Sequence, residues 1–322
     1  MRRRTSGWCG AAIVGLTLSI TAGARSDQRQ VLPPAVSRPA GGPERFTVSS
    51  DGHPMAVWGR RPANPHGTIL LVHGLTWSTR PDFDLQVPGL QRSVMADLAA
   101  QGFAAYGVDL RGYGETPRDS TGWLTPRRSA TDVANVLAWI ATQHPSLPKP
   151  ALIGWSRGGA IAELVAQLSP DRLSAVVLFG FAFNPDGQFV DVPPPDKPSM
   201  DKNTAAAAAS DFISPKVTPP AVVKAFVDQA LKADPVRADL KGDIEFNLLK
   251  PDKVTVPTLV MYGALDPGID HADAGKFFAH LGTGDRRLVV LPGADHAAQL
   301  EDTHDMWVAA VVSFLNRPPA RR

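Results

Sequence analysis

The chain has 322 residues, of which 43% are apolar, and a formal net charge of +2. This length fits one large α/β domain with an insertion. The apolar content is high enough to bury a large core, which excludes an intrinsically disordered chain. The nearly balanced charge predicts no nucleic-acid partner. The single cysteine, Cys9, lies in the segment that we expect to be removed, so we predict no disulfide.

The first 24 residues have the pattern of a secretory signal peptide: an arginine-rich start, an apolar core at residues 11–20 and a small-residue cleavage site, Ala22-Gly23-Ala24. The apolar core is too short to hold the chain across a membrane. We therefore predict cleavage near Ala24 and a periplasmic or secreted protein without a stable membrane span. An uncleaved N-terminal anchor is the alternative, and the export route stays open.

Residues 25–45 are polar and rich in proline, and we expect them to form a flexible lead-in. Beyond them, strand and helix patterns alternate. Strands are predicted at residues 46–48, 55–58, 68–73, 103–110, 150–153, 175–181, 257–263 and 287–291, and helices at 90–101, 129–143, 160–168 and 298–315. This alternation calls for right-handed crossovers and a mostly parallel sheet of eight strands with helices on both faces.

Residues 184–256 interrupt the alternation with three consecutive prolines, a run of five alanines, and apolar-periodic segments at 221–231 and 244–249. We interpret them as a mostly helical cap inserted between two core segments, 46–183 and 257–316. Such a cap would exclude water and shape the substrate pocket. The alternative is an unstructured insertion, because alanines and prolines bury little apolar surface.

A Gly-x-Ser-x-Gly motif, Gly154 to Gly158, joins the strand ending at Ile153 to the following helix. Small residues are needed beside Ser156, because side chains at so sharp a corner would collide with the backbone. The helix N-terminus directs free N–H groups toward charge that forms beside the serine. This nucleophile elbow resembles that of the α/β-hydrolase superfamily. The resemblance covers about residues 46–315 and implies the α/β-hydrolase fold with a cap.

Two further turns carry the same resemblance. His73-Gly74-Leu75, after the third strand, is similar to the superfamily's oxyanion turn, which implies that the backbone N–H groups of Leu75 and Arg157 form the oxyanion hole. We expect His73 to brace this loop. The pattern D-x-R-G-x-G at residues 109–114 is common after the fourth strand of these proteins, and we expect it to form a turn held by an Asp–Arg hydrogen-bond network.

A serine attacks an ester at neutral pH only if a neutral imidazole removes its proton. His296 follows the last predicted strand, and Asp266 follows the strand before it, so both lie at the sheet edge that holds Ser156. The chain order Ser156, Asp266, His296 is the order that the resemblance implies for a catalytic triad. Asp186, after the sixth strand, is an alternative acid.

Several polar and aromatic residues near the motifs are expected to have structural or pocket-lining roles instead of catalytic ones. We expect His304 to lie on the surface and Asp295 to be solvated or to cap a turn. Four aromatic residues are candidates to line the substrate pocket: Trp77, Trp155, Phe181 and Phe183. For Trp155 and Phe181 the alternative is an ordinary place in the core.

These features predict an exported serine hydrolase that cleaves small-molecule carboxylic esters through an acyl-enzyme, without cofactor or metal. No H-E-x-x-H motif or cysteine cluster indicates a metal site. A serine at the elbow disfavours dehalogenase and epoxide hydrolase chemistry, since related proteins use Asp there. A lactonase, an amidase or a cofactor-free perhydrolase would use the same triad. The alternative of a different class is a non-catalytic binding protein on this scaffold.

Overall fold

The computed structural model describes residues 41–181, 184–214 and 216–318. The predicted signal peptide and residues 25–40 of the predicted lead-in lie outside the described residues. The first strand, β1 (Glu44–Ser50), begins inside the segment assigned to the lead-in. Within the described part of the chain, no helix has both the length and the apolar character needed to cross a bilayer.

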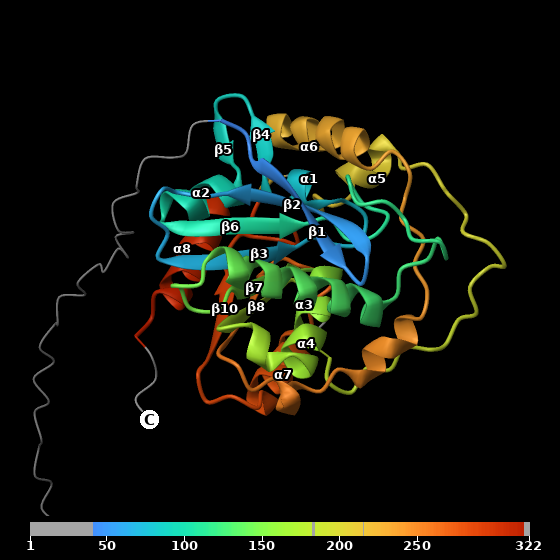
Figure 1. Ribbon diagram of the computed structural model, residues 1–322. Coiled ribbons are helices and arrows are strands. Elements are labelled where there is room, and N and C mark those ends of the chain that lie inside the picture. The colour runs from blue at the N-terminus through green and yellow to red at the C-terminus, as the bar shows by residue number, and fades with distance from the viewer. Residues whose placement is uncertain (1–40, 182–183, 215, 319–322) are drawn as a thin grey trace, which may run out of the picture. The chain divides into compact units, whose positions relative to one another are not determined.

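An eight-stranded sheet forms the centre of the fold, with strand order β1-β2-β6-β3-β7-β8-β9-β10 (Figure 1). The first two strands and β6 pair antiparallel, and all pairs from β6 to β10 are parallel. The remaining strands of this sheet are β2 (His53–Arg60), β3 (Gly67–Val72), β6 (Phe103–Val108), β7 (Ala151–Trp155), β8 (Ala175–Phe179), β9 (Thr258–Gly263) and β10 (Arg286–Leu291). The predicted mostly parallel sheet is confirmed.

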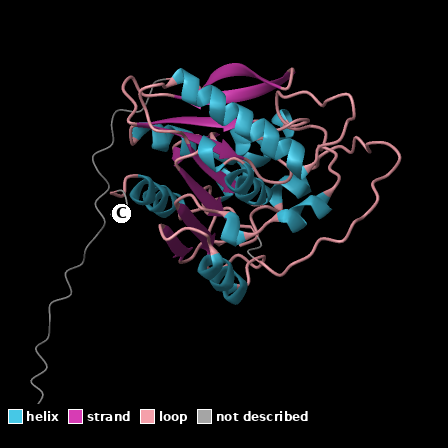
Figure 2. Cartoon of the chain, turned by 60° about the horizontal axis from the view of Figure 1, so that its bottom comes forward, coloured by secondary structure: helices cyan, strands magenta, loops and turns pink. Residues whose placement is uncertain are grey.

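Helices cover both faces of the sheet, because its central strands are apolar on both sides (Figure 2). Along β3, Leu70 and Val72 join one buried cluster, and Ile69 and Leu71 join the other. The first cluster lies under α3 (Pro126–Gln143), α4 (Arg157–Leu168) and α7 (His271–His280). The second lies under α2 (Val94–Ala100) and α8 (His304–Leu315).

Two predicted helices are shorter than expected. The helix predicted at 90–101 starts only at Val94, because the Ser93 hydroxyl accepts the Ala96 N–H at 3.0 Å and so caps the helix there. Its first residues instead form β5 (Leu90–Arg92), which pairs with β4 (Leu85–Val87). The helix predicted from residue 298 is α8, and a turn occupies the residues before it, with the Thr303 hydroxyl donating to the Ala298 carbonyl. A short helix, α1 (Thr79–Phe83), was not predicted.

The 184–256 insertion is less helical than predicted. It contains α5 (Ala205–Ala209), α6 (Pro220–Ala233) and the 3-10 helices η2 (Asp243–Leu248) and η3 (Pro251–Lys253), and its other described residues are extended or in turns. Five prolines between residues 185 and 198 explain this, because proline lacks the N–H that a helix interior needs. Helix α6 nevertheless buries Val222, Phe226 and Ala230 against the core.

Candidate active site

The end of β7 and the start of α4 hold Ser156 in a backbone conformation that is unusual for a residue with a side chain, φ 55° and ψ −124°. A Cβ atom on Gly154 would lie 2.1 Å from the Gly158 carbonyl oxygen, and one on Gly158 would lie 2.4 Å from the Val72 carbonyl oxygen. Both positions therefore require glycine. The Ser156 N–H donates to the Phe179 carbonyl at 2.8 Å, which helps to hold the corner. Strain of this kind, about 1–3 kcal/mol, occurs mainly at functional sites.

The loops after β9 and β10 are joined to each other at the same edge of the sheet. The Leu265 N–H donates to the Ala294 carbonyl at 2.8 Å. A Cβ atom on Gly263 would lie 2.2 Å from the Asp295 carbonyl oxygen, so glycine allows this close approach. The Trp155 indole also donates to the His296 carbonyl, at 2.8 Å. These contacts fix both loops beside the serine.

The structure brings the three predicted triad residues into one hydrogen-bonded chain. His296 Nδ1 lies 2.8 Å from Asp266 Oδ2, and His296 Nε2 lies 3.0 Å from Ser156 Oγ. The second carboxylate oxygen of Asp266 accepts the Gly268 N–H at 2.9 Å. Because a carboxylate only accepts, the proton is assigned to Nδ1, and Nε2 keeps a lone pair for the serine hydroxyl.

The environment of His296 favours the charged imidazole. Burial acts to lower its pKa, but the hydrogen bond and the negative charge of Asp266 outweigh burial, so the pKa of His296 is raised. The carboxylates of Asp211 and Asp295 act in the same direction. An imidazole that gains a proton during a reaction would be stabilised at this position.

The two predicted oxyanion residues, Leu75 and Arg157, line one cavity together with Ser156 and His296. The oxyanion turn is held from behind, since the Gly74 N–H donates to Asp82 Oδ2 at 3.0 Å. Within residues 41–181, 184–214 and 216–318, neither the Leu75 N–H nor the Arg157 N–H donates to a protein acceptor. Both amides therefore remain without a protein acceptor in this part of the chain, as the predicted oxyanion role requires.

His73 braces the oxyanion turn, as expected. Its Nε2 accepts the Leu110 N–H at 3.1 Å, so Nδ1 carries the proton and donates to the Gly74 carbonyl at 3.0 Å. Burial lowers the pKa of His73 to about 4. The ring is therefore neutral near pH 7 and links the turn to the end of β6.

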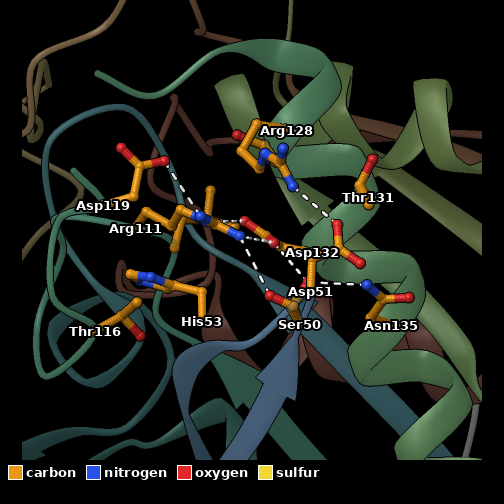
Figure 3. Close-up of polar contacts among 12 residues, drawn as sticks. Ser50, Asp51, His53, Arg111, Thr116, Asp119, Arg128, Thr131, Asp132 and Asn135 are labelled. Atoms are coloured by element: carbon orange, nitrogen blue, oxygen red, sulfur yellow. Dashed lines mark hydrogen bonds and ion pairs between the residues drawn. The ribbon is translucent and has the colours of Figure 1, made fainter. Parts of the chain in front are cut away.

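The turn at residues 109–114 is held by a network of hydrogen bonds and ion pairs, which Figure 3 shows around Arg111. Arg111 donates to both oxygens of Asp132, each at 2.8 Å, and to Asp119 at 3.2 Å. The Ser50 hydroxyl donates to Asp132 at 2.6 Å. Asp109 holds other elements instead, accepting from the Trp58 indole at 2.9 Å. The arginine thus ties the turn to helix α3.

One of the weaker sequence expectations is wrong. His304 is buried, not on the surface, because it opens α8 where that helix meets α2, and its Nε2 lies 2.8 Å from Asp97 Oδ2. Of the two roles expected for Asp295, the structure shows turn capping: Asp295 is buried and accepts the Ala297 N–H at 3.3 Å. Asp186, the alternative acid, is paired with Lys276 on the surface, and among the described residues no hydrogen bond or ion pair joins it to His296.

A cavity of about 490 Å³ opens at the serine and is lined mainly by apolar side chains from the core and the insertion. Phe181 belongs to this lining, but Trp77 and Trp155 do not. Both tryptophans are almost completely buried, Trp77 edge-on against Phe226 and Trp155 beside His296, so their assignment to the pocket is wrong. Phe183 lies outside the described residues.

The side chains of two lining residues, Arg157 and Glu163, were given no role in the sequence analysis. The Arg157 guanidinium donates to both oxygens of Asp243, at 3.0 and 2.7 Å, and lies 4.9 Å from the centre of the Phe246 ring. Glu163 is only 1% exposed, and burial raises its pKa to about 8. The signal for Glu163 was present in the sequence, as an acidic residue within the apolar run 160–168. No group of three or more His, Cys, Asp or Glu in the described ranges could hold a metal ion.

The strand order, the serine elbow and the Ser-His-Asp chain define an α/β-hydrolase. The family model for serine aminopeptidases of family S33 matches residues 63–303 of this chain. The chain belongs to this family and is a serine hydrolase.

Individual relatives are distant. The chain is 24% identical over 263 residues to a monoacylglycerol lipase of Mycolicibacterium smegmatis, covering 78% of this chain and 89% of the relative. A solved putative aryl esterase from Burkholderia cenocepacia has a TM-score of 0.61 at 20% identity, covering 84% of this chain and 98% of that one. A thermophilic esterase from Thermogutta terrifontis has a TM-score of 0.59 at 20% identity with the same coverage. These structural likenesses show the fold.

Proposed function

We propose that the protein is an exported carboxylic ester hydrolase that acts through Ser156, His296 and Asp266. The observation that carries this proposal is the hydrogen-bonded chain from Asp266 to Ser156, with its two distances of 2.8 and 3.0 Å, at the opening of a mainly apolar cavity. The names of the relatives, a lipase and two esterases, support esters as the substrate class. The pattern of residues 1–24 supports export.

The reaction follows from these contacts. Ser156 Oγ attacks the ester carbonyl carbon while His296 Nε2 takes its proton, and Asp266 stabilises the resulting imidazolium. The carbonyl oxygen becomes an oxyanion that accepts from the N–H groups of Leu75 and Arg157, each worth about 3 kcal/mol at the transition state. His296 then protonates the departing alcohol, which leaves an acyl group on Ser156. Water, deprotonated by the same imidazole, releases the acid.

The insertion contributes to this function by covering the cavity. Phe189, Phe246 and Leu249 line it from residues 184–256, and the Arg157–Asp243 ion pair joins the insertion to helix α4 beside the serine. We infer that this cover excludes water from the developing charge and selects the shape of the substrate.

The test compares wild type with Ser156→Ala and His296→Ala on p-nitrophenyl esters, lactones and amino-acid anilides. Ester turnover should exceed the other two, and each substitution should lower kcat by roughly 10⁴-fold or more. Circular dichroism should be unchanged, and Ser146→Ala, which alters an exposed serine, should retain full activity. A fluorophosphonate probe should label wild type only through Ser156. A wild-type protein that neither labels nor hydrolyses any of these substrates would refute the proposal.

A further inference from the structure

Glu163 lies on the cavity wall two helical turns beyond the serine. It belongs to α4, which starts directly after Ser156, and both residues line the same cavity with Ala160 between them. Seven residues of helix advance about 10 Å along the axis. Side chains in a helix tilt toward its N-terminus, so the carboxyl group of Glu163 leans back toward Ser156. A substrate bound at the serine and lying along α4 would therefore reach it.

Among the residues that the structure describes, the carboxyl group of Glu163 has no hydrogen-bond or ion-pair partner to account for its burial. The residue is 1% exposed, its Oε1 atom is buried without a hydrogen bond, and no hydrogen bond or ion pair involves Glu163 within the residues that the structure describes. An unsatisfied buried polar group destabilises a fold by about 1–3 kcal/mol. Leucine at this position would avoid that penalty, so stability does not explain the glutamate. A local rule broken in this way is expected at functional sites.

The surroundings define which group could satisfy this carboxyl. Phe246, Leu249 and Pro251 line the cavity as well, and Arg157, the one arginine among the described lining residues, is already bound to Asp243. Burial raises the pKa of Glu163 to about 8, so the carboxyl is mostly protonated at neutral pH. A protonated carboxyl offers one O–H donor and accepts through its other oxygen. Its complement is a neutral group that also donates and accepts, because an isolated charge in such a wall is strongly unfavourable.

We propose that Glu163 is a specificity-determining residue that binds a free hydroxyl group of the substrate, so that the preferred substrates are esters carrying a hydroxyl at a distance from the scissile bond. This inference rests on the ester hydrolase function proposed above. The apolar wall between Ser156 and Glu163 holds the carbon chain, and the carboxyl forms a hydrogen bond with the hydroxyl at its end through Oε2, the oxygen that is not enclosed by protein.

The test uses matched pairs of substrates. One series compares p-nitrophenyl esters of linear acids with their ω-hydroxy analogues, and a second compares simple alkyl butyrates with monobutyrates of linear diols. Wild type should prefer the hydroxylated member at one chain length in one of the series, by roughly tenfold in kcat/KM. Glu163→Leu should lose this preference. Glu163→Gln, which keeps a donor and an acceptor, should retain most of it.

Two further measurements separate the possible failures. Fluorophosphonate labelling of Ser156 reports whether the nucleophile works in each variant, independently of any preference. Thermal unfolding should show Glu163→Leu to be at least as stable as wild type, because an unsatisfied carboxyl is removed. Equal kcat/KM for both members of every pair in a wild type that labels and hydrolyses would overturn this inference alone. A lower melting temperature for Glu163→Leu, with its preference unchanged, would assign Glu163 to the structure instead.

Discussion

Replacing Asp266 by asparagine tests the proposed role of the carboxylate with little change in shape. The two oxygens of Asp266 have different partners, the Gly268 N–H at 2.9 Å and His296 Nδ1 at 2.8 Å. An asparagine that keeps its oxygen on Gly268 presents its NH₂ group to His296. Nδ1 must then accept, the imidazole proton moves to Nε2, and Nε2 can no longer take the proton of Ser156. The flipped amide would instead set NH₂ against the Gly268 N–H and leave that donor unpaired.

The expected effect is large in rate and has a defined sign in pH. A wrong tautomer with intact geometry lowers kcat by about 10⁴-fold in a serine hydrolase of another fold, which corresponds to about 5.5 kcal/mol. The pKa of His296 is raised because Asp266 outweighs the effect of burial. His296 acts as a base only when neutral, so the acid limb of the wild-type pH–rate profile should lie above the usual histidine pKa. In Asp266→Asn the imidazole loses this support, and the limb should move to lower pH.

The assay is kcat/KM for a p-nitrophenyl ester measured from pH 5 to pH 9, a window that brackets the usual histidine pKa of about 6.5. Asp186→Asn serves as the control, because Asp186 is an exposed carboxylate paired with Lys276 and its profile should match wild type. A residual rate within about tenfold of wild type, with an unmoved acid limb, would show that Asp266 does not orient His296. The neighbouring carboxylates Asp211 and Asp295 would then be the groups to replace.

Two further predictions concern stability. Gly158→Ala places a Cβ atom 2.4 Å from the Val72 carbonyl oxygen, so it should lower the melting temperature and abolish activity. Gly275 lies in helix α7, and a Cβ atom there would meet nothing within 4 Å. Gly275→Ala should therefore stabilise the folded protein by about 0.5–1 kcal/mol. Burial raises the pKa of Glu301 to about 9, and Asp295 adds to this, so the folded state holds a proton that the unfolded state releases near the usual glutamate pKa. The free energy of unfolding of wild type, measured with urea, should therefore fall as pH rises from about 5 to 9, by up to about 1.4 kcal/mol per pH unit. Glu301→Gln should flatten this slope. An unchanged slope in the variant would contradict a proton held by Glu301 in the folded state.

The strand ends could be located in the sequence, and with them the residues that meet at the sheet edge. Continuous apolar runs mark the buried strands, and in a parallel sheet their carboxyl ends share one edge, so Ser156, Asp266 and His296 could be placed together before any coordinates were known. The Gly-x-Ser-x-Gly corner was readable for a similar reason. Glycine is needed there because backbone atoms approach within 2.1–2.4 Å of where a Cβ atom would lie. Those atoms belong to residues close in the sequence or to the end of the adjacent strand.

Side-chain surroundings could not be predicted where the partner is remote in the chain. His304 is buried where helix α8 packs against α2, and Asp97 on α2 approaches its ring there. Trp77 belongs to the core because Phe226, on the insertion, covers it. Nothing in the flanking residues of His304 or Trp77 indicates these contacts, since each depends on how one element packs on another. The helix periodicity of residues 160–168 likewise predicted α4 without showing that Glu163 faces a cavity.

Arg157 joins the two parts of the site that sequence reasoning treated separately. Its backbone N–H is a proposed oxyanion donor, while its side chain pairs with Asp243 on η2 and lies over the Phe246 ring. Asp243 is 43% exposed, so the ion pair adds little to stability, about 0–1 kcal/mol. Its two parallel hydrogen bonds are directional, however, and fix the position of η2 relative to the first turn of α4. A displacement of η2 would therefore act directly on the residue after the nucleophile, whose backbone N–H is the proposed oxyanion donor.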